Sequence, residues 1–516
     1  MTLDIHDLHD RPVIIGGGIA GLMTALHLAP EPVVLLSRAP LGGEASSTLA
    51  QGGLASSLGA DDSPDLHLAD TLAAGDGLCD ETIARRVVEA APMAIENLER
   101  LGVTFDRDRD GSLLLGLEAA HSRRRIVHAA GDATGREVVR ALTVAVRRTP
   151  SVTILEGMEA RRLLVEDGAI AGVLAAGNAG SVALSTSRVV LATGGVGGLF
   201  RDTTNPLGSF GQGLALAARA GAELADLEFV QFHPTGLDSP RRPMPLVSEA
   251  VRGEGAVLID ERGRRFLAGT PGGELAPRDV VARAVWRHLA AGHRVFLDAR
   301  QCLGPKFAEC FPAIATFCQE AGIDPASEPI PVRPAAHYHM GGVAVDAQGR
   351  SSVAGLWASG EAACTGLHSA NRLASNSLTE AVVSAAWVAE SVAAASAGRG
   401  GGRLFPTIMP PRPDASRIRP IASSALGIVR DAETLREAAA TLLPIAAGRE
   451  TASDPALVAL MIAITAFRRE ESRGSHYRSD FPQHNTYPSS SRLTLGEAIE
   501  AAAALVDIAA PLARKA

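Results

Sequence analysis

Two apolar runs near the start of the chain flank a glycine-rich segment, and this order predicts a nucleotide-binding unit. The run Val13-Ile14-Ile15 predicts a short buried strand, and residues 22–29 predict the helix that follows it. The glycine-rich residues 16–21 join the two, and the apolar residues 33–36 predict a second, parallel strand. This order of strand, glycine turn, helix and strand is typical of a Rossmann-like α/β fold.

The glycines of this first unit stand where a dinucleotide needs them. Gly16, Gly18 and Gly21 supply a tight turn, close approach to a pyrophosphate, and packing of helix on strand. The N-terminus of the helix adds N–H groups and a favourable dipole for phosphates. An acid is usual at the end of the second strand, but Ser37-Arg38 stands there, so we expect weaker contacts to the ribose or adenine region.

Two later apolar runs also end in glycine-containing turns. Residues 188–195, RVVLATGG, and residues 356–361, LWASGE, each predict a strand that returns to the cofactor. Residues 44–53, EASSTLAQGG, predict a loop of small and hydroxylic side chains that lies along a flavin. NAD is usually held by the first βαβ region alone, so segments this distant favour FAD. A glycine-rich turn in another kind of α/β protein is the alternative.

The remaining pattern suggests several parts. Residues from about 243 to 332 interrupt the flavin motifs, and a Gly/Pro-rich linker from Gly398 to Pro413 precedes helix-like runs at 453–470 and 493–513. Thr134 with Glu137 predicts a capping box for a helix over residues 136–148.

Composition narrows the function classes. A chain of 516 residues with a net charge of −8 is expected to form more than one domain and argues against a nucleic-acid surface. Its five cysteines form no CxxC pair, which suits a reducing compartment and predicts no metal site. The N-terminus lacks the apolar core of a secretory signal, and no apolar run approaches the roughly 18 residues that span a bilayer. We therefore expect a soluble cytoplasmic protein.

The segment of residues 357–378, WASGEAACTGLHSANRLASNSL, carries one guanidinium among residues suited to burial. A charge that Arg372 cannot shed needs an anionic partner there, and a substrate fits better than a surface acid. In the same segment, Glu361 follows Ser-Gly and can accept hydrogen bonds from ligand hydroxyls.

These motifs carry a resemblance to a known family. GGGIAGL, SSTLAQGG, ATGG, EFVQFHPT, EGAVLIDERGRRF, PRDVVARA, HYHMGG and SGEAACTGLHSANRLASNSL occur in the order seen in the succinate dehydrogenase/fumarate reductase flavoprotein superfamily. The resemblance covers roughly four-fifths of the chain, and residues 468–482 extend it. Within the superfamily the chain most resembles the L-aspartate oxidase family.

The resemblance implies an α/β Rossmann-like FAD-binding domain in two sequence pieces, an inserted α+β capping domain and a C-terminal helical domain. We expect these at residues 1–242 and 333–404, 243–332, and 414–516, respectively. The residues expected to bind FAD are Gly16, Gly17, Gly18, Ile19, Ala20, Gly21, Arg38, Ser46, Ser47, Thr48, Leu49, Ala50, Gln51, Gly52, Gly53, Gln212, Glu361, Asn376, Ser377 and Leu378.

One absent imidazole separates branches of the superfamily. Respiratory members carry a His that bonds covalently to the flavin just before the Thr of the TxAAQGG loop, where this chain has Ser47. We therefore expect non-covalent FAD, and this absence, with the short chain, favours the L-aspartate oxidases over a membrane-complex subunit.

The expected chemistry calls for cations and imidazoles around a flat substrate. A C4 dicarboxylate with an α-amino group must lie against the isoalloxazine, lose a proton from its ammonium, and pass a hydride from Cα to N5. Both carboxylates must be fixed for this transfer. The resemblance assigns Arg278 as the catalytic residue, and as substrate-binding residues Glu118, Gln231, His233, Ser248, Glu249, His337 and Arg372.

Several of these residues have a plainer interpretation. His233 is expected in a turn before Pro234 and could be structural, as could His337 and its neighbour His339, to which we assign no role. Arg278 is expected to open a helix. Because the pKa of Arg exceeds about 12, we expect it to position a carboxylate rather than act as a base.

Two of these plainer interpretations concern charges at the protein surface. The alternative for Arg278 is a surface pair with Asp279 or Arg283, and for Glu118 it is a solvated loop carboxylate neutralised by the arginines at 123–125. Ser248 keeps the hydroxyl of the Thr usual at its position.

Three functions remain open from sequence. The leading hypothesis is oxidation of L-aspartate to iminoaspartate, with FAD reoxidised by O₂ or fumarate, as the first step of NAD biosynthesis, which would link the chain to quinolinate synthase. The alternatives are a soluble fumarate reductase or succinate oxidase, and a flavin-binding subunit without turnover of its own.

Overall fold

The computed structural model describes residues 8–178, 180–396 and 408–513. Its centre is a five-stranded parallel sheet in the order β17-β10-β1-β2-β6, in which Val13 lies beside Val189 and Val34, and Val189 beside Leu356. The four strands expected from the apolar runs are thereby confirmed, and β6 completes the sheet. Their bounds are β1 Val13–Ile15, β2 Val33–Ser37, β6 Val152–Glu156, β10 Val189–Leu191 and β17 Leu356–Ala358.

Helices cover this sheet and bury its apolar side chains. The expected first helix is α1, which packs against α10 and α4 over a cluster that includes Ile14 and Leu22. Smaller sheets and helices complete this part of the chain. Their bounds are α1 Ile19–Leu28, α2 Pro64–Ala74, α3 Glu81–Arg100, α4 Thr134–Arg147, α5 Gln212–Arg219, α10 Asn376–Ala394, β3 Leu54–Ala55, β4 Leu115–Gly116, β5 Ile126–Val127, β7 Met158–Glu166, β8 Ala169–Gly177, β9 Gly180–Ser185, β11 Leu224–Ala225, β16 Gly342–Ala344, β18 Ala363–Cys364 and β19 Arg492–Leu493.

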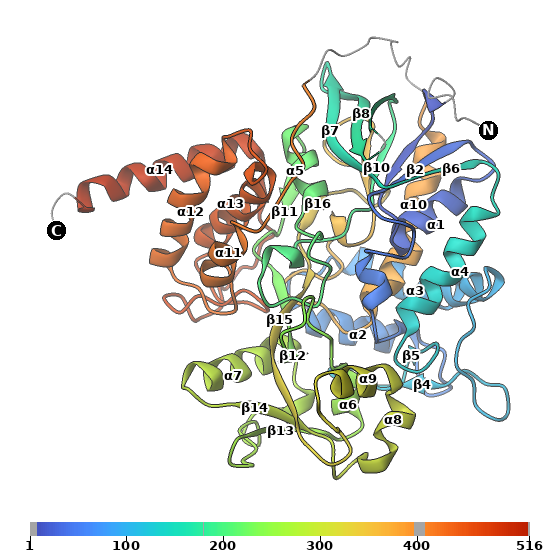
Figure 1. Ribbon diagram of the computed structural model, residues 1–516, viewed down its shortest axis with the longest axis vertical. Coiled ribbons are helices and arrows are strands. Elements are labelled where there is room, and N and C mark those ends of the chain that lie inside the picture. The colour runs from blue at the N-terminus through green and yellow to red at the C-terminus, as the bar shows by residue number, and fades with distance from the viewer. Residues whose placement is uncertain (1–7, 179, 397–407, 514–516) are drawn as a thin grey trace.

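The segment that interrupts the flavin motifs has an apolar cluster of its own. This part lies at the bottom of Figure 1 and combines a four-stranded antiparallel sheet with short helices, which is the α+β character expected of a cap. Its elements are β12 Val230–Leu237, α6 Glu249–Gly253, β13 Val257–Asp260, α7 Arg278–Ala290, β14 Val295–Asp298, α8 Phe307–Cys310, α9 Pro312–Glu320 and β15 Ile330–His339.

Two local expectations were wrong. His233 lies within β12, not in a turn, because the strand accommodates Pro234 by shifting its register against β15 between His233 and Gly236. No capping box forms at Thr134, which is itself the first residue of α4: its hydroxyl accepts the Ala129 N–H at 3.1 Å, and Glu137 accepts the Thr104 N–H.

The C-terminal helices share the main core. The expected helix-like runs are confirmed as α13 and α14, and α13 packs Leu457 and Leu460 into the same apolar cluster as Val13 of β1. Most of the expected linker, residues 398–413, lies outside the described residues. These helices, at the left of Figure 1, are α11 Arg419–Ala425, α12 Ala432–Ala446, α13 Ser453–Arg468 and α14 Leu495–Ala513.

Among the described residues, no helix combines the length and apolarity required to cross a bilayer.

Candidate active site

An elongated cavity follows the carboxyl ends of the parallel strands, where ligands bind in open α/β sheets. It is lined by residues directly after β1, β2, β10 and β17, including Gly16, Arg38, Gly194 and Gly360. The predicted cofactor motifs therefore meet in space although almost 350 residues of sequence separate the first from the last.

Two glycines of the turn after β1 leave no room for a side chain. A Cβ on Gly16, whose φ is +126°, would lie 2.1 Å from the Ala192 carbonyl oxygen, and one on Gly21 would lie 1.9 Å from the Gly16 oxygen. Helix α1 starts directly after Gly18, with no side chain capping it and no acid in its first turn. This bare, electropositive helix end suits the pyrophosphate of a dinucleotide.

Most of the predicted cofactor residues line the cavity. Those that do are Gly16, Gly17, Gly18, Ile19, Ala20, Arg38, Ser46, Ser47, Leu49, Ala50, Gln212, Glu361, Ser377 and Leu378. Those that do not are Gly21, Thr48, Gln51, Gly52, Gly53 and Asn376. Asn376, for example, is bonded through its side chain to His67 and Thr71, behind the cavity wall.

Arg38 and Ser37 are held by the protein itself. The Arg38 guanidinium donates to the Gly208 carbonyl and lies 3.3 Å from Glu44, while the Ser37 hydroxyl donates to the Ala39 carbonyl at 2.6 Å. Sequence reasoning missed several other lining residues. The hydroxyl and amide side chains of Thr204 and Asn205 gave a detectable signal, whereas the start of β7 gave none. The missed residues include Met158, Glu159, Ala160, Thr204, Asn205, Gly208 and Ser209.

Unpartnered polar atoms show that the cavity suits a ligand rich in hydrogen-bonding groups. Thr193 Oγ1 and Gln212 Oε1 are buried without a partner among the described residues, and both residues line the cavity. Glu361 accepts the His339 backbone N–H at 2.9 Å, and burial raises the pKa of its carboxyl to about 7. These acceptors and the glycine turn fit the flavin dinucleotide expected from sequence.

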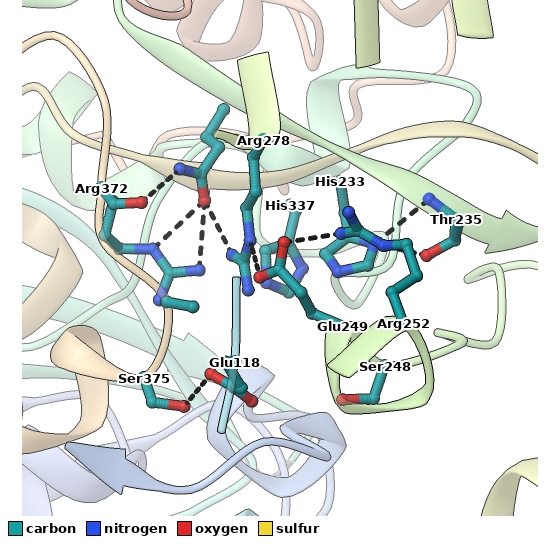
Figure 2. Close-up of polar contacts among 12 residues, drawn as sticks. Glu118, His233, Thr235, Ser248, Glu249, Arg252, Arg278, His337, Arg372 and Ser375 are labelled. Carbon is teal, nitrogen blue, oxygen red and sulfur yellow. Dashed lines mark hydrogen bonds and ion pairs between the residues drawn. The ribbon is translucent and has the colours of Figure 1, made fainter. Parts of the chain in front are cut away.

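A cluster of buried polar and charged side chains, drawn in Figure 2, reaches the cavity through Arg372 and His337, which line it. The other predicted substrate residues do not line the cavity; these are Glu118, Gln231, His233, Ser248, Glu249 and Arg278. Gln231 Oε1 accepts from Arg278 at 2.9 Å and from Arg372 at 3.2 and 3.3 Å, so one amide oxygen joins two guanidinium groups. Glu249 binds Arg278 at 2.8 Å through one oxygen and Arg252 at 2.6 Å through the other. Burial acts to raise the pKa of Glu249, but Arg278 and Arg252 outweigh it and the net shift is downward.

The cluster has an excess of positive charge. Arg252 and Arg278 pair with the carboxylate of Glu249, and Arg372 lies beside them, so these four side chains carry two more positive charges than negative ones. Arg372 forms no ion pair with any described residue; it donates to Ser377 at 2.7 Å and stacks on the ring of Tyr338. Burial, and next the charge of Arg278, lowers the pKa of Arg372 to about 10. A dianion of matching size would relieve this repulsion.

The two predicted histidines face each other beside the arginines, with ring centroids 5.2 Å apart. Burial, and next the charge of Arg278, holds the pKa of both imidazoles well below 6.5, so both are neutral. The Thr235 backbone N–H donates to His233 Nδ1 at 3.2 Å. The proton of His233 therefore sits on Nε2, which is buried without a partner among the described residues.

The imidazoles of His337 and His339 have different surroundings. His337 Nδ1 lies 2.8 Å from the hydroxyl of Thr204, and His337 lines the cavity. His339 turns away: its Nε2 lies 3.0 Å from the Leu227 carbonyl, and burial lowers its pKa to about 4. The part of His339 that serves the site is its backbone, which holds Glu361.

Glu118 is buried, with 2% of its surface exposed, so the solvated-loop interpretation was wrong. Ser375, whose φ is +58°, donates to its carboxyl at 2.6 Å. Burial, and next the charge of Glu249, raises the pKa of Glu118 despite the opposing effect of Arg278. Arg125, one of the arginines expected to neutralise it, instead binds Asp62 and Asp70.

The surface-pair interpretation of Arg278 was also wrong. Arg278 is the first residue of α7 as expected, but it is buried and paired with Glu249. The next residue, Asp279, forms the predicted helical pair with Arg283 and also accepts the Asn371 amide at 3.0 Å. One turn of α7 thus contacts the charge cluster on one side and the chain beside Arg372 on the other.

Ser248 stays apart from the charged groups. Its hydroxyl caps α6 by accepting the Ala250 N–H at 3.3 Å, and Figure 2 shows it on that turn with no bond to the cluster. Sequence reasoning missed Arg252, Ser375, Thr204 and Tyr338. Arg252 was detectable, because Glu249 and Arg252 stand three residues apart and share one helix face.

The comparisons with known proteins agree with this geometry. The family model described as "FAD binding domain" matches residues 11–378, and that described as "Fumarate reductase flavoprotein C-term" matches residues 452–492. The L-aspartate oxidase of Mesorhizobium japonicum is 72% identical over 505 residues, covering 98% of both chains. That of Agrobacterium fabrum is 59% identical over 497 residues, covering 96% of this chain and 95% of its own.

Solved structures are similar over almost the whole chain. A mutant of the E. coli quinol fumarate reductase flavoprotein superimposes with a TM-score of 0.85 at 29% identity, covering 94% of both chains. A quinol-fumarate reductase with menaquinol superimposes with a TM-score of 0.82 at 29% identity, covering 93% of this chain and 94% of its own.

The position of the His233 proton gives a testable prediction. Replacing His233 with Gln puts an amide N–H near Nε2 and should weaken binding of succinate less than fivefold or so, whereas His233→Asn reaches only the Nδ1 position and should weaken it about tenfold or more. Titration of succinate into the flavin-loaded protein, followed by flavin absorbance, measures both. Equal losses in the two variants would contradict the assignment.

Proposed function

Because this chain belongs to the L-aspartate oxidase family of FAD-binding flavoproteins, we propose that its buried charge cluster holds L-aspartate against the flavin. The activity itself is the FAD-dependent oxidation of L-aspartate in NAD biosynthesis. When bound, FAD supplies the acceptor for the hydride that leaves Cα. The protein's own residues bind, orient and shield the substrate.

The observation that carries this proposal is the pair of unbalanced positive charges. Arg372 and Arg278, joined by the Gln231 oxygen, each offer N–H groups to a carboxylate, and a dicarboxylate brings the two negative charges that the cluster lacks. The Nε2–H of His233 adds a neutral donor. Fixing both ends of the substrate holds Cα in one position, which is the main requirement for hydride transfer.

Arg278 acts in this proposal as the catalytic group that contacts substrate. Glu249, held in turn by Arg252, pairs with the Arg278 guanidinium and fixes its orientation. Its role is to orient a carboxylate and stabilise charge, because a guanidinium gives up its proton too reluctantly to serve as a base.

Glu118 is the residue that recognises the amino group. L-Aspartate and succinate both offer two carboxylates, so the arginines of the cluster cannot distinguish them. Only a group that contacts the ammonium can favour aspartate. Glu118 is buried, and Ser375 fixes its direction. Burial and the charge of Glu249 raise the pKa of its carboxyl, Arg278 and Arg372 oppose them, and an arriving ammonium would favour the ionised form.

The finer points complete the proposal. O₂, giving H₂O₂, or fumarate reoxidises the flavin, and fumarate fits the same cluster because it is also a C4 dicarboxylate. The unstable imine passes to quinolinate synthase in the cytoplasm. The domain boundaries are those expected from sequence, with the cap at residues 243–332 covering the site.

Production of H₂O₂ by the purified protein in air tests the function. L-Aspartate should give H₂O₂ and succinate should give far less, because only aspartate offers an amine to Glu118. Peroxidase-coupled detection measures both rates. Turnover with succinate alone would favour a succinate oxidase, and none with either substrate a subunit that needs a partner.

The mode of flavin attachment is tested by acid precipitation. Ser47 lines the cavity with its hydroxyl 3.4 Å from the Ile19 N–H and offers no imidazole for a covalent bond. Flavin absorbance should therefore remain in the supernatant after the protein is precipitated. Yellow colour retained in the washed pellet would contradict non-covalent binding.

The role of Glu118 predicts a pH dependence. Aspartate should bind more tightly as pH rises through the raised pKa of Glu118, because binding the ammonium requires the carboxylate form. Glu118→Gln should weaken aspartate binding about tenfold and remove this dependence. Succinate binding serves as the control, and an equal loss for both ligands would rule out recognition of the amine.

A further inference from the structure

The side-chain amide of Gln212, at the wall of the flavin cavity, is oriented by a residue far away in sequence. Gln212, the first residue of α5, lines the cavity, and its Oε1 is buried without a partner among the described residues. Its Nε2 does have one: it donates to Asp454 Oδ2 at 3.1 Å. Asp454 lies in the first turn of α13, among the C-terminal helices.

The chemistry of Asp454 decides which way the Gln212 amide points. An ionised carboxylate can only accept hydrogen bonds, so the side of the amide facing Asp454 must be the NH₂ group. The other oxygen of Asp454 accepts from Arg219 Nε at 2.7 Å, and this ion pair fixes the position of the carboxylate. The amide oxygen of Gln212 is thereby turned away from Asp454 and remains a fixed acceptor on a residue that lines the cavity.

Packing makes this arrangement rigid. Helices α5 and α13 lie against each other, and Gly211, just before Gln212, has a φ of +83°. A Cβ on Gly211 would lie 2.9 Å from a methyl carbon of Val458, so α13 touches the turn that presents Gln212. Asp454 itself is buried.

We propose that Asp454 is a positioning residue for FAD: it holds the Gln212 amide so that Oε1 accepts a hydrogen bond from a hydroxyl or N–H group of the bound cofactor. The C-terminal helices thus complete the flavin site although they do not line it. The proposal rests on Gln212 lying in the flavin site, as the proposed function has it.

Variants that remove the negative charge of Asp454, or place one at position 212, test the proposal through the affinity for FAD. The full-length apoprotein is titrated with FAD, and quenching of flavin fluorescence gives the Kd. Asp454→Asn should raise the Kd about threefold to fivefold, because the amide is no longer held in one orientation. Gln212→Glu should raise it about tenfold or more, because two carboxylates then face each other.

The double variant Gln212→Glu with Asp454→Asn should return the Kd to within about twofold of the original. Its Asn amide can donate to the new Glu, whose second oxygen again faces the cavity as an acceptor, and the total charge is unchanged. A double variant no better than Gln212→Glu alone would overturn the proposal, as would an unchanged Kd for Asp454→Asn.

Two further variants distinguish a failure of the proposal for Asp454 from a failure of the flavin-site assignment. Asp431→Asn changes an acid at the start of α12, where it caps the helix, and should leave the Kd unchanged. Gln212→Leu should weaken FAD binding. If it does not, Gln212 lies outside the flavin site and the site assignment itself is wrong. For any variant whose apoprotein does not fold, the rate of FAD release from purified holoprotein provides the same comparison.

Discussion

Two guanidinium groups that share one amide oxygen in a buried site are the arrangement on which the rest of the structure depends. Arg278 and Arg372 repel each other, and burial removes the water that would screen them. Gln231, Glu249 and the ring of Tyr338 offset part of this cost. The charge that remains unbalanced favours an anionic ligand, which is the basis of the proposed substrate site.

The repulsion between the two guanidinium groups explains why the site is assembled from separate parts of the chain. Arg278 and Glu249 come from α7 and α6 in the segment of residues 243–332, Arg372 and Ser375 from the segment between β18 and α10, and Glu118 from the loop after β4. A single helix or strand could not place like charges so close without neighbours to hold them. None of these segments alone brings the charges together; the cluster exists only when the chain is folded.

Sequence patterns predicted the elements that neighbouring residues in the chain determine. The parallel strands, α1 and the glycine turn follow from apolar runs and from positions that tolerate no side chain. The failures have long-range causes: β12 continues through Pro234 because β15 adapts its register, and Thr134 is used by the neighbouring loop. Pairs such as Glu118 with Ser375, or Gln212 with Asp454, join residues more than 240 positions apart, and no window of sequence reveals them.

The first turn of α7 couples the positions of the two guanidinium groups. Arg278 faces the charge cluster while Asp279, beside it, binds Asn371 next to Arg372. A shift of α7 would therefore change both contacts at once, so the spacing between the two guanidinium groups depends on the position of this single helix.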